Sequence, residues 1–350
     1  MNDTIRIGRK TIGPGHPVYI VAEISANHNQ KYEEAVRLVR AAKEAGADAV
    51  KLQTLTPDTI TLRSDQPCFR VGGGTLWDGR TMYDLYVETY MPWEWQPKLQ
   101  SVANEVGLDL FSSPFDPTAV DFLEKMHVPA YKVASFEIVD LPLVERMART
   151  GKPLIISTGM ATVEEIQEAI NAALSAGAKE IALLKCNSGY PAPPDEMNLR
   201  TMLDMRDRFR LPVGLSDHTL GTEVPIAATS LGACIIEKHF TLSRAVPGPD
   251  AAFSLEPAEF RSLVEGVRTV ERALGRVAYG PTPAERKSLP FRRSLFVVED
   301  VRAGDRFNEK NVRSIRPANG LPPRDLDRVL GRKARRDIPA GTPLSWDLIE

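Results

Sequence analysis

The 350-residue sequence is poor in cysteine, carries almost no excess charge and contains no long apolar run. The three cysteines, Cys68, Cys186 and Cys234, cannot all pair, and so low a content is typical of a reducing compartment. The formal net charge of −2 provides no general basic surface for nucleic acid. The first residues lack the apolar core of a signal peptide, and no run reaches the roughly 18 apolar residues of a membrane helix. We therefore expect a soluble cytoplasmic protein with no nucleic-acid or membrane partner.

No predicted strand is followed by a G-x-G-x-x-G turn, and this absence disfavours a doubly wound open sheet. The first 275 residues instead alternate between short, apolar, β-branched runs and amphipathic helical patterns. The apolar runs span residues 18–24, 49–53, 108–113, 130–135, 153–158, 181–187, 212–218 and 234–240. The helical patterns at 33–46 and 162–177 each end in Gly, as many helices do. Eight strand–helix units in succession predict a (β/α)8 TIM barrel over residues 1–280.

Two segments depart from this alternation. The connection over residues 54–91 is far longer than the usual βα loop of about 2–6 residues, which is typical of a functional loop. Its Trp and Tyr content argues against disorder, and MYDLYVETY (82–90) has the spacing of a short amphipathic helix. A Pro-rich, charged linker is predicted at 281–290. Residues 291–350 then change to short strands with turns at AGD and PAGT, which predicts a small separate domain.

Polar side chains stand at the carboxyl ends of all eight predicted strands, where (β/α)8 barrels carry their active sites. They are Glu23, Lys51, Gln53, Ser112, Ser113, Lys132, Ser135, Ser157, Asn187, Ser188, Ser216, His218, Glu237 and His239. One such residue could simply be a helix N-cap, but Lys and His are poor N-caps, so caps do not explain the set. We infer an active site at this end of the barrel.

His218 and His239 are predicted to meet, because they end the seventh and eighth strands, which are neighbours. Alternate residues on a strand share a face, which places Glu237 with His239. Two imidazoles and a carboxylate suit Mn²⁺, Fe²⁺, Co²⁺ or Zn²⁺ and leave positions open for water and substrate. A hydrogen-bonded core histidine or a general acid is the alternative for either residue. We expect a divalent metal, with Mn²⁺ favoured and Mg²⁺ or Co²⁺ as alternatives.

Lysines and serines at the same strand ends predict a second ligand. Positive charge comes from Lys51 and Lys132, and hydroxyl groups come from Ser113, Ser135, Ser157, Ser188 and Ser216. Together these groups suit a phosphate and a carboxylate. An ion pair of a lysine with Glu23 or Glu137 is the alternative for the empty protein. A metal beside an anion pocket is suited to condensing phosphoenolpyruvate with an aldehyde.

Eight motifs, in order along the chain, resemble those of the sialic acid synthase (nonulosonic acid synthase) family. They are AEISANHNQ (22–30), AVKLQ (49–53), FSSPFD (111–116), AYKVASFE (130–137), IISTGM (155–160), GLSDHT (214–219), EKHFT (237–241) and PGPDAAFS (247–254). The tail from about residue 291, with IRPANG (315–320) and DIPAGTPL (337–344), is similar to that family's antifreeze-like (SAF) domain. The resemblance covers essentially the whole chain. It implies a barrel followed by an SAF domain, in a homodimer whose small domain closes over the partner's barrel.

The resemblance also implies roles for individual residues. His218 and His239 match the ligands of a divalent metal that polarises a sugar aldehyde. Positions around phosphoenolpyruvate match Lys51, Ser113, Lys132, Ser135, Ser157, Ser188 and Ser216, although the family has Asn where this chain has Ser188. Sugar-side positions match Glu23, Gln53, Tyr190 and Asp250. Glu137 matches a carboxylate assigned to the attacking water or the proton transfers, and Arg316 matches the residue that reaches the sugar's acyl group.

Within the family, LWDGRTMYDLYVETYMPWEW (76–95) resembles the loop of pseudaminic acid synthases, which use 2,4-diacetamido-2,4,6-trideoxy-L-altrose. We expect that activity, and the candidate sugar contacts are Trp77, Tyr83, Tyr86, Trp93 and Trp95. The alternative for these aromatics is packing of the loop on the barrel. The alternative function is that of an N-acetylneuraminic or legionaminic acid synthase.

Two other function classes are disfavoured. Deoxyoctulosonate and deoxyheptulosonate phosphate synthases run the same condensation on phosphorylated sugars, but they would not need the carboxyl-terminal domain. Ice binding favours flat arrays of small residues such as Thr, whereas residues 291–350 contain one threonine and eleven arginines.

Overall fold

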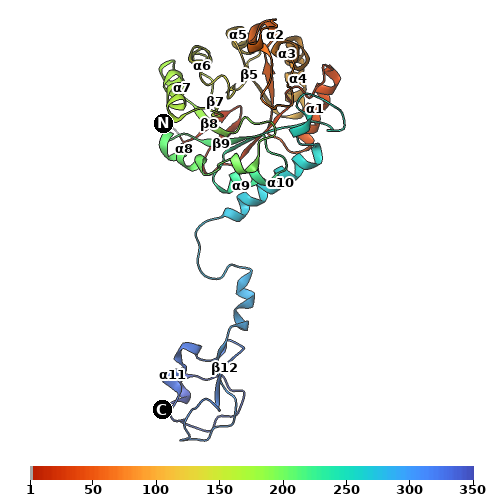
Figure 1. Cartoon of the computed structure of the whole chain (residues 1–350). Coiled ribbons are helices and arrows are strands. Elements are labelled where there is room, and N and C mark those ends of the chain that lie inside the picture. Colours follow the sequence, from red (N-terminus) through yellow and green to blue (C-terminus); the bar gives the residue numbers. More distant parts are fainter. Residues whose placement is uncertain (1–2) are drawn as a thin grey trace. The chain divides into compact units, whose positions relative to one another are not determined.

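Eight parallel strands close into a barrel in the first part of the chain (Figure 1). The computed structural model describes residues 3–350, and the chain divides into two units between Gly275 and Arg276. The barrel strands are β3 (Tyr19–Glu23), β4 (Ala49–Thr54), β5 (Asp109–Pro114), β6 (Tyr131–Val133), β7 (Leu154–Ser157), β8 (Ile181–Cys186), β9 (Val213–Asp217) and β10 (Ile235–His239). Each lies within or next to one of the eight predicted runs. β10 pairs with both β9 and β3, so the sheet has no free edge, and the predicted (β/α)8 architecture is confirmed.

Helices surround the barrel, as Figure 1 shows. They are α1 (Tyr32–Glu44), α4 (Gln96–Val106), α5 (Pro117–Lys125), α6 (Leu141–Ala148), α7 (Val163–Ser175), α8 (Thr201–Phe209), α9 (Glu223–Ser230) and α10 (Pro257–Leu274). α7 illustrates why they form: Thr162 caps the backbone N–H of Glu165, and the Glu165 side chain accepts from the N–H of Thr162. Its apolar residues at helical spacing, Ile166 to Ala173, are buried against the strands. No helix among residues 3–350 is both long and apolar enough to cross a membrane.

Side-chain alternation along the strands separates two cores. On β3, Ile20 and Ala22 point outward to the helices, whereas Tyr19 and Val21 point into the barrel. Continuing this alternation places Glu23 inside, one layer above Val21. The other strands follow the same rule, so the barrel interior is apolar at the amino end and polar at the carboxyl end.

A hairpin before the first barrel strand closes the amino end of the barrel. Its strands, β1 (Ile5–Ile7) and β2 (Lys10–Ile12), pair antiparallel. Three isoleucines of the hairpin, Ile5, Ile7 and Ile12, are buried with the inner core residues of the barrel. This end is therefore plugged by apolar side chains, which leaves the opposite end for the site.

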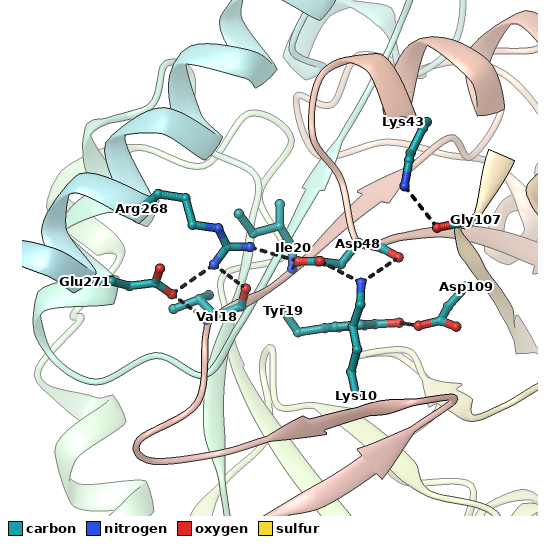
Figure 2. A network of polar contacts seen from close by, with 10 residues as sticks. All are labelled: Lys10, Val18, Tyr19, Ile20, Lys43, Asp48, Gly107, Asp109, Arg268 and Glu271. Carbon is teal, nitrogen blue, oxygen red and sulfur yellow. Dashed lines mark hydrogen bonds and ion pairs between the residues drawn. The ribbon is translucent and has the colours of Figure 1, made fainter.

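A polar network holds this closed end together (Figure 2). Asp48, before β4, pairs with Lys10 of the hairpin at 2.7 Å and with Arg268 of α10 at 3.1 Å. It also accepts the backbone N–H of Ile20 at 2.9 Å. The Tyr19 hydroxyl donates to Asp109 at 2.8 Å. One network thus connects the hairpin, the first barrel strands and the last barrel helix.

The long connection between β4 and α4 is ordered. It contains α2 (Pro57–Ile60), the 3-10 turns η1 (Pro67–Phe69) and η2 (Trp93–Trp95), and α3 (Met82–Thr89), which confirms the predicted short helix. Trp93 donates its ring N–H to the carbonyl of Leu55 at 3.0 Å and packs on Phe122. Trp95 packs on His28 and Tyr32. These two tryptophans pack the loop onto the barrel, as the packing alternative expected.

The second unit, residues 276–350, has its own small core. β11 (Ser294–Val297) pairs antiparallel with β12 (Val312–Ile315). The remaining elements are η5 (Glu285–Phe291), η6 (Pro323–Asp325), α11 (Leu326–Val329) and η7 (Trp346–Leu348). The predicted turns at AGD and PAGT are present, each with a glycine at positive φ, 83° at Gly304 and 87° at Gly341. Leu295, Phe307 and Leu344 are among the residues that fill the core of this unit.

Candidate active site

The strand register brings the predicted residues together at the open end of the barrel. His239 of β10 is paired with Glu23 of β3, and Glu23 is paired with Lys51 of β4. On the other side of β10, Glu237 is paired with Ser216 of β9. All five side chains are buried. Residues far apart in the sequence thus line two successive inward-facing layers of the barrel mouth.

Glu237 lies at the centre of these side chains. Its Oε1 atom is 3.2 Å from Lys51 Nζ, 3.2 Å from Lys132 Nζ and accepts from Ser216 Oγ at 3.1 Å. Burial raises the pKa of Glu237, but the ammonium groups of Lys132 and Lys51 outweigh burial and hold the pKa well below its usual range. Lys51 also pairs with Glu23 at 2.5 Å. The expected ion pair of Lys51 with Glu23 is therefore present, whereas the partner of Lys132 is Glu237 and not Glu137.

Two of the predicted hydroxyl donors have unused hydrogen-bonding capacity. Ser113 Oγ on β5 and Ser157 Oγ on β7 are buried and have no hydrogen-bond partner among the described residues. Ser135 Oγ, next to them after β6, accepts the backbone N–H of Gly159 at 3.2 Å. A buried hydroxyl without a partner costs free energy. This wall of the site is therefore suited to donate hydrogen bonds to the oxygens of an anion.

Gly159 is a functional position that the sequence reasoning missed. A Cβ atom there would lie 2.3 Å from Ser188 Oγ and 2.7 Å from Ser135 Oγ. Only glycine therefore allows these two predicted hydroxyls to share the space above β7. The IISTGM motif contains this glycine, but sequence alone does not show which side chains approach it.

The two histidines meet as predicted, with ring centroids 5.3 Å apart. Nδ1 of His218 is 2.7 Å from the carbonyl of Asn187, so it carries the proton and leaves Nε2 as the free ligand atom. Burial and the neighbouring positive charges lower the pKa of His239, which keeps its ring neutral. Its Nδ1 atom is buried and has no hydrogen-bond partner within the described chain. Burial lowers the pKa of His218, but the neighbouring Cys186 thiol and the carbonyl of Asn187 outweigh burial and raise it above its ordinary value. Imidazoles in their neutral form, with a free nitrogen atom, fit a divalent metal.

The metal site would take most of its ligands from outside the protein. Among residues 3–350, no three His, Cys, Asp or Glu side chains come together as a metal site. The expected protein carboxylate therefore does not join the two imidazoles. Two histidines alone would leave several coordination positions for water and substrate oxygens.

Tyr190 and Asp250 border the histidines. The Tyr190 ring lies 4.3 Å from the His218 ring and 5.2 Å from that of Phe253, measured between centroids. Asp250 accepts from the Ser25 hydroxyl, and burial raises the pKa of its carboxyl group to about 6. With Gln53, half-buried on β4, these residues form a second wall of mixed aromatic and polar character.

Glu137 stands at the edge of the site, in the turn after β6. Burial raises its pKa to about 7, and the lysines oppose this shift only partly. Its Oε2 atom is buried and lacks a hydrogen-bond partner in the described part of the chain. Burial raises the pKa of Tyr86 in the long loop, and the charge of the nearby Glu137 raises it further. Glu137 is thus a carboxyl group of this site whose pKa lies near neutrality.

Arg316 is the one predicted site residue in the second unit. It is exposed and follows β12 directly. The other predicted residues all lie in the barrel unit.

The fold and the site define a (β/α)8-barrel enzyme with buried lysines and serines beside a histidine pair. Comparison with known protein families supports this class. Residues 38–279 match the model of the NeuB family, and residues 292–350 match that of the SAF domain. The chain belongs to the NeuB family.

Its relatives cover nearly the full length. The pseudaminic acid synthase of Helicobacter pylori is 45% identical over 336 residues, covering 95% of this chain and 98% of the relative. The N,N'-diacetyllegionaminic acid synthase of Legionella pneumophila is 36% identical, with 98% of each chain covered. Among solved structures, the spore coat polysaccharide biosynthesis protein spsE of Bacillus subtilis has a TM-score of 0.68 and 34% identity, covering 99% of both chains.

Proposed function

We propose that this chain is a pseudaminic acid synthase, which condenses phosphoenolpyruvate with 2,4-diacetamido-2,4,6-trideoxy-L-altrose to give pseudaminic acid and phosphate. The observation that carries the proposal is the meeting of two lysines, two unpaired serine hydroxyls and two histidines at the buried carboxyl end of the barrel. The 45% identity to the H. pylori pseudaminic acid synthase supports the choice of sugar.

Phosphoenolpyruvate binds on the lysine side of the site. Lys51 and Lys132 hold its negative charges, and Ser113 and Ser157 donate to its oxygens. The lysines are preorganised by Glu237, which keeps both ammonium groups in place before the substrate arrives. Preorganised donors in a site that excludes water stabilise charge more strongly than they would in water.

His218 and His239 hold a divalent metal, for which Mn²⁺ is favoured over Mg²⁺ or Co²⁺. When bound, the metal acts as a Lewis acid on the sugar aldehyde. Tyr190 and Asp250 border the same space and position the sugar. Glu23 and Gln53 face it from β3 and β4.

The reaction needs a group that exchanges a proton near neutral pH. C3 of phosphoenolpyruvate forms a bond to the aldehyde carbon, and the aldehyde oxygen becomes a hydroxyl with a proton from solvent. Water then adds at C2 and gives its proton to the carboxylate of Glu137. The C2–O bond to phosphate breaks as the C2 hydroxyl loses its proton to the departing phosphate. A base with a pKa of about 7 suits this role, because near neutral pH a large fraction is deprotonated and this form is basic enough to accept a proton.

We further propose that the protein works in the cytoplasm as a homodimer. Cys186 and Cys234 are buried as free thiols and Cys68 is exposed, which supports a reducing compartment.

The substrate assignment can be tested by following phosphate release with saturating phosphoenolpyruvate and Mn²⁺. We expect strong preference, in kcat/KM, for the 2,4-diacetamido-trideoxyaltrose over N-acetylmannosamine, and loss of turnover when a chelator removes the metal. A buried methyl contributes roughly 1–3 kcal/mol to discrimination, and an unpaired sugar hydroxyl costs about as much again. Equal values, or preference for N-acetylmannosamine, would overturn the proposal in favour of an N-acetylneuraminic acid synthase. Preference for the legionaminic precursor would favour the L. pneumophila type, and use of a phosphorylated aldose would favour the deoxyoctulosonate class.

A further inference from the structure

A cavity of about 580 Å³ lies between the long loop and the segment that follows β10. Its apolar lining includes Leu76, Trp77 and Pro247, and its polar lining includes Asn29, Arg80 and Glu88. We call it the loop pocket. Its volume lies within the roughly 300–1,000 Å³ of small-molecule sites, and its lining combines apolar side chains with polar groups that can orient a ligand.

The loop pocket is connected to the histidine pair through two aromatic rings. The Trp77 ring lies 5.8 Å from the Tyr190 ring, which in turn lies 4.3 Å from His218. The Trp77 ring N–H also donates to the carbonyl of Pro249 at 3.2 Å, directly before Asp250. Trp77 of the pocket is therefore separated from His218 by a single aromatic ring, that of Tyr190.

The polar groups of the pocket offer both kinds of hydrogen-bonding partner. Arg80 and Glu88 form an ion pair whose side chains are 31% and 57% exposed, so both can reach a ligand. Gln30 donates to the carbonyls of Tyr90 at 2.5 Å and Glu88 at 3.2 Å, which fixes the end of α3 against the barrel. The lining of the pocket thus combines a guanidinium donor, a carboxylate acceptor and apolar side chains.

An acetamido group presents the complementary set. Its carbonyl accepts a hydrogen bond, its N–H donates one, and its methyl group needs an apolar surface. Resting on the proposed function, we propose that the loop pocket binds the acetamido group at C4 of the sugar and that Arg80 determines specificity for it. Arg80 donates to the amide carbonyl, Glu88 accepts from the amide N–H, and the methyl group packs on Trp77.

The test compares two sugars on wild type, Arg80→Ala, Arg80→Lys and Arg63→Ala. The sugars are the 2,4-diacetamido-trideoxyaltrose and its analogue with a hydroxyl in place of the C4 acetamido group. Arg63 is the matched control, because it lies in the same loop but its guanidinium stacks on Tyr83, 4.3 Å from the ring centroid, away from the pocket lining.

We expect Arg80→Ala to lower kcat/KM for the diacetamido sugar about 10- to 100-fold, the range for losing a hydrogen bond to a charged group. Turnover of the C4-hydroxyl analogue and the KM for phosphoenolpyruvate should change less than about twofold, Arg80→Lys should recover part of the loss, and Arg63→Ala should behave as wild type. An equal fall for both sugars, or no fall for either, would overturn the role of Arg80 while wild-type preference for the diacetamido sugar still upholds the function. Wild type that does not use the diacetamido sugar would overturn both.

Discussion

Glu137 differs from Glu23 and Glu237 because it forms no ion pair with a lysine among the described residues. One carboxyl oxygen is buried without a hydrogen bond from the described residues, and burial raises the pKa to about 7. Glu237 shows the opposite behaviour, because two lysines hold it ionised. Two glutamates at one barrel mouth therefore have different protonation states near neutrality, which separates a proton-exchanging role from a charge-holding role.

The pH dependence of kcat/KM tests the role of Glu137. Because the carboxylate accepts a proton from water, activity should rise with pH through about 7, the pKa to which burial raises this group. Glu137→Gln should lose about 10²- to 10⁴-fold in rate and should lose this inflection. Its melting temperature at pH 8 should not fall, because the change removes a charge that burial disfavours. An inflection that persists in the variant would assign the titration to another group.

The sequence indicated which residues form the site, but it showed less about which side chains they contact. Lys51, Lys132, His218 and His239 were predicted because alternation along a strand fixes which side chains point into a barrel. The central place of Glu237 was not predicted, because it depends on the register of β9 and β10 and on the reach of two lysines from other strands. Cys186 was overlooked for the same reason, although its thiol lies 3.7 Å from His218.

Among the elements, the network at the closed end of the barrel joins parts that are distant in the sequence. Asp48 is its centre, since it contacts the hairpin, β3 and α10 together (Figure 2). The conserved architecture of such barrels assigns this end to stability and the opposite end to catalysis.

Asp48→Ala should therefore destabilise the barrel and leave the site intact. The change leaves Lys10, Arg268 and the N–H of Ile20 without this acceptor, a loss of about 1–3 kcal/mol. Glu34→Ala is a suitable control, because it removes an exposed i,i+3 ion pair with Arg37 that is worth roughly 0–1 kcal/mol. Urea unfolding followed by circular dichroism measures both, and kcat at 25 °C should not change. Equal stability of the two variants would contradict the proposed importance of the network.

The strands and outer helices could be predicted because their apolar patterns, with periods of 2 and 3.6 residues, continue over enough residues to be recognised. The hairpin at residues 5–12 could not, since each of its strands has three residues and its role depends on the barrel it plugs. The aromatic residues of the long loop were ambiguous for a related reason. Their number indicates a folded loop, but only the structure separates Trp77 at the pocket from Trp93 and Trp95 against the barrel.

For the whole molecule, the second unit (residues 276–350) is the part that carries Arg316. We propose that it covers the barrel of a partner subunit and brings Arg316 to the acyl group of the sugar. Residues 291–350 carry thirteen Lys and Arg against nine Asp and Glu, a balance of +4 that leaves −6 for the rest of the chain. Opposite net charges favour association of the two parts, whether within a chain or between chains.

Arg316→Ala should impair sugar use far more than phosphoenolpyruvate binding. His239→Ala should lose metal and activity while remaining folded, which metal analysis of the purified variant checks. When the two inactive variants are mixed, hybrid dimers contain one barrel with His239 that receives Arg316 from the other chain, so part of the activity should return. No recovery, with subunit exchange demonstrated by native mass spectrometry, would show that Arg316 acts within its own chain.

The closure of the barrel also has a consequence for how the protein is made. Arg268 of α10 donates to the carbonyl of Val18 across 250 residues, and β10 completes the sheet by pairing with β3. At roughly 5–20 residues per second, a ribosome needs about 10–50 s to synthesise the residues between these partners. During that interval β3 has an unpaired edge, which is a template for pairing with other chains. The nascent chain is therefore expected to depend on chaperone protection until α10 has left the exit tunnel.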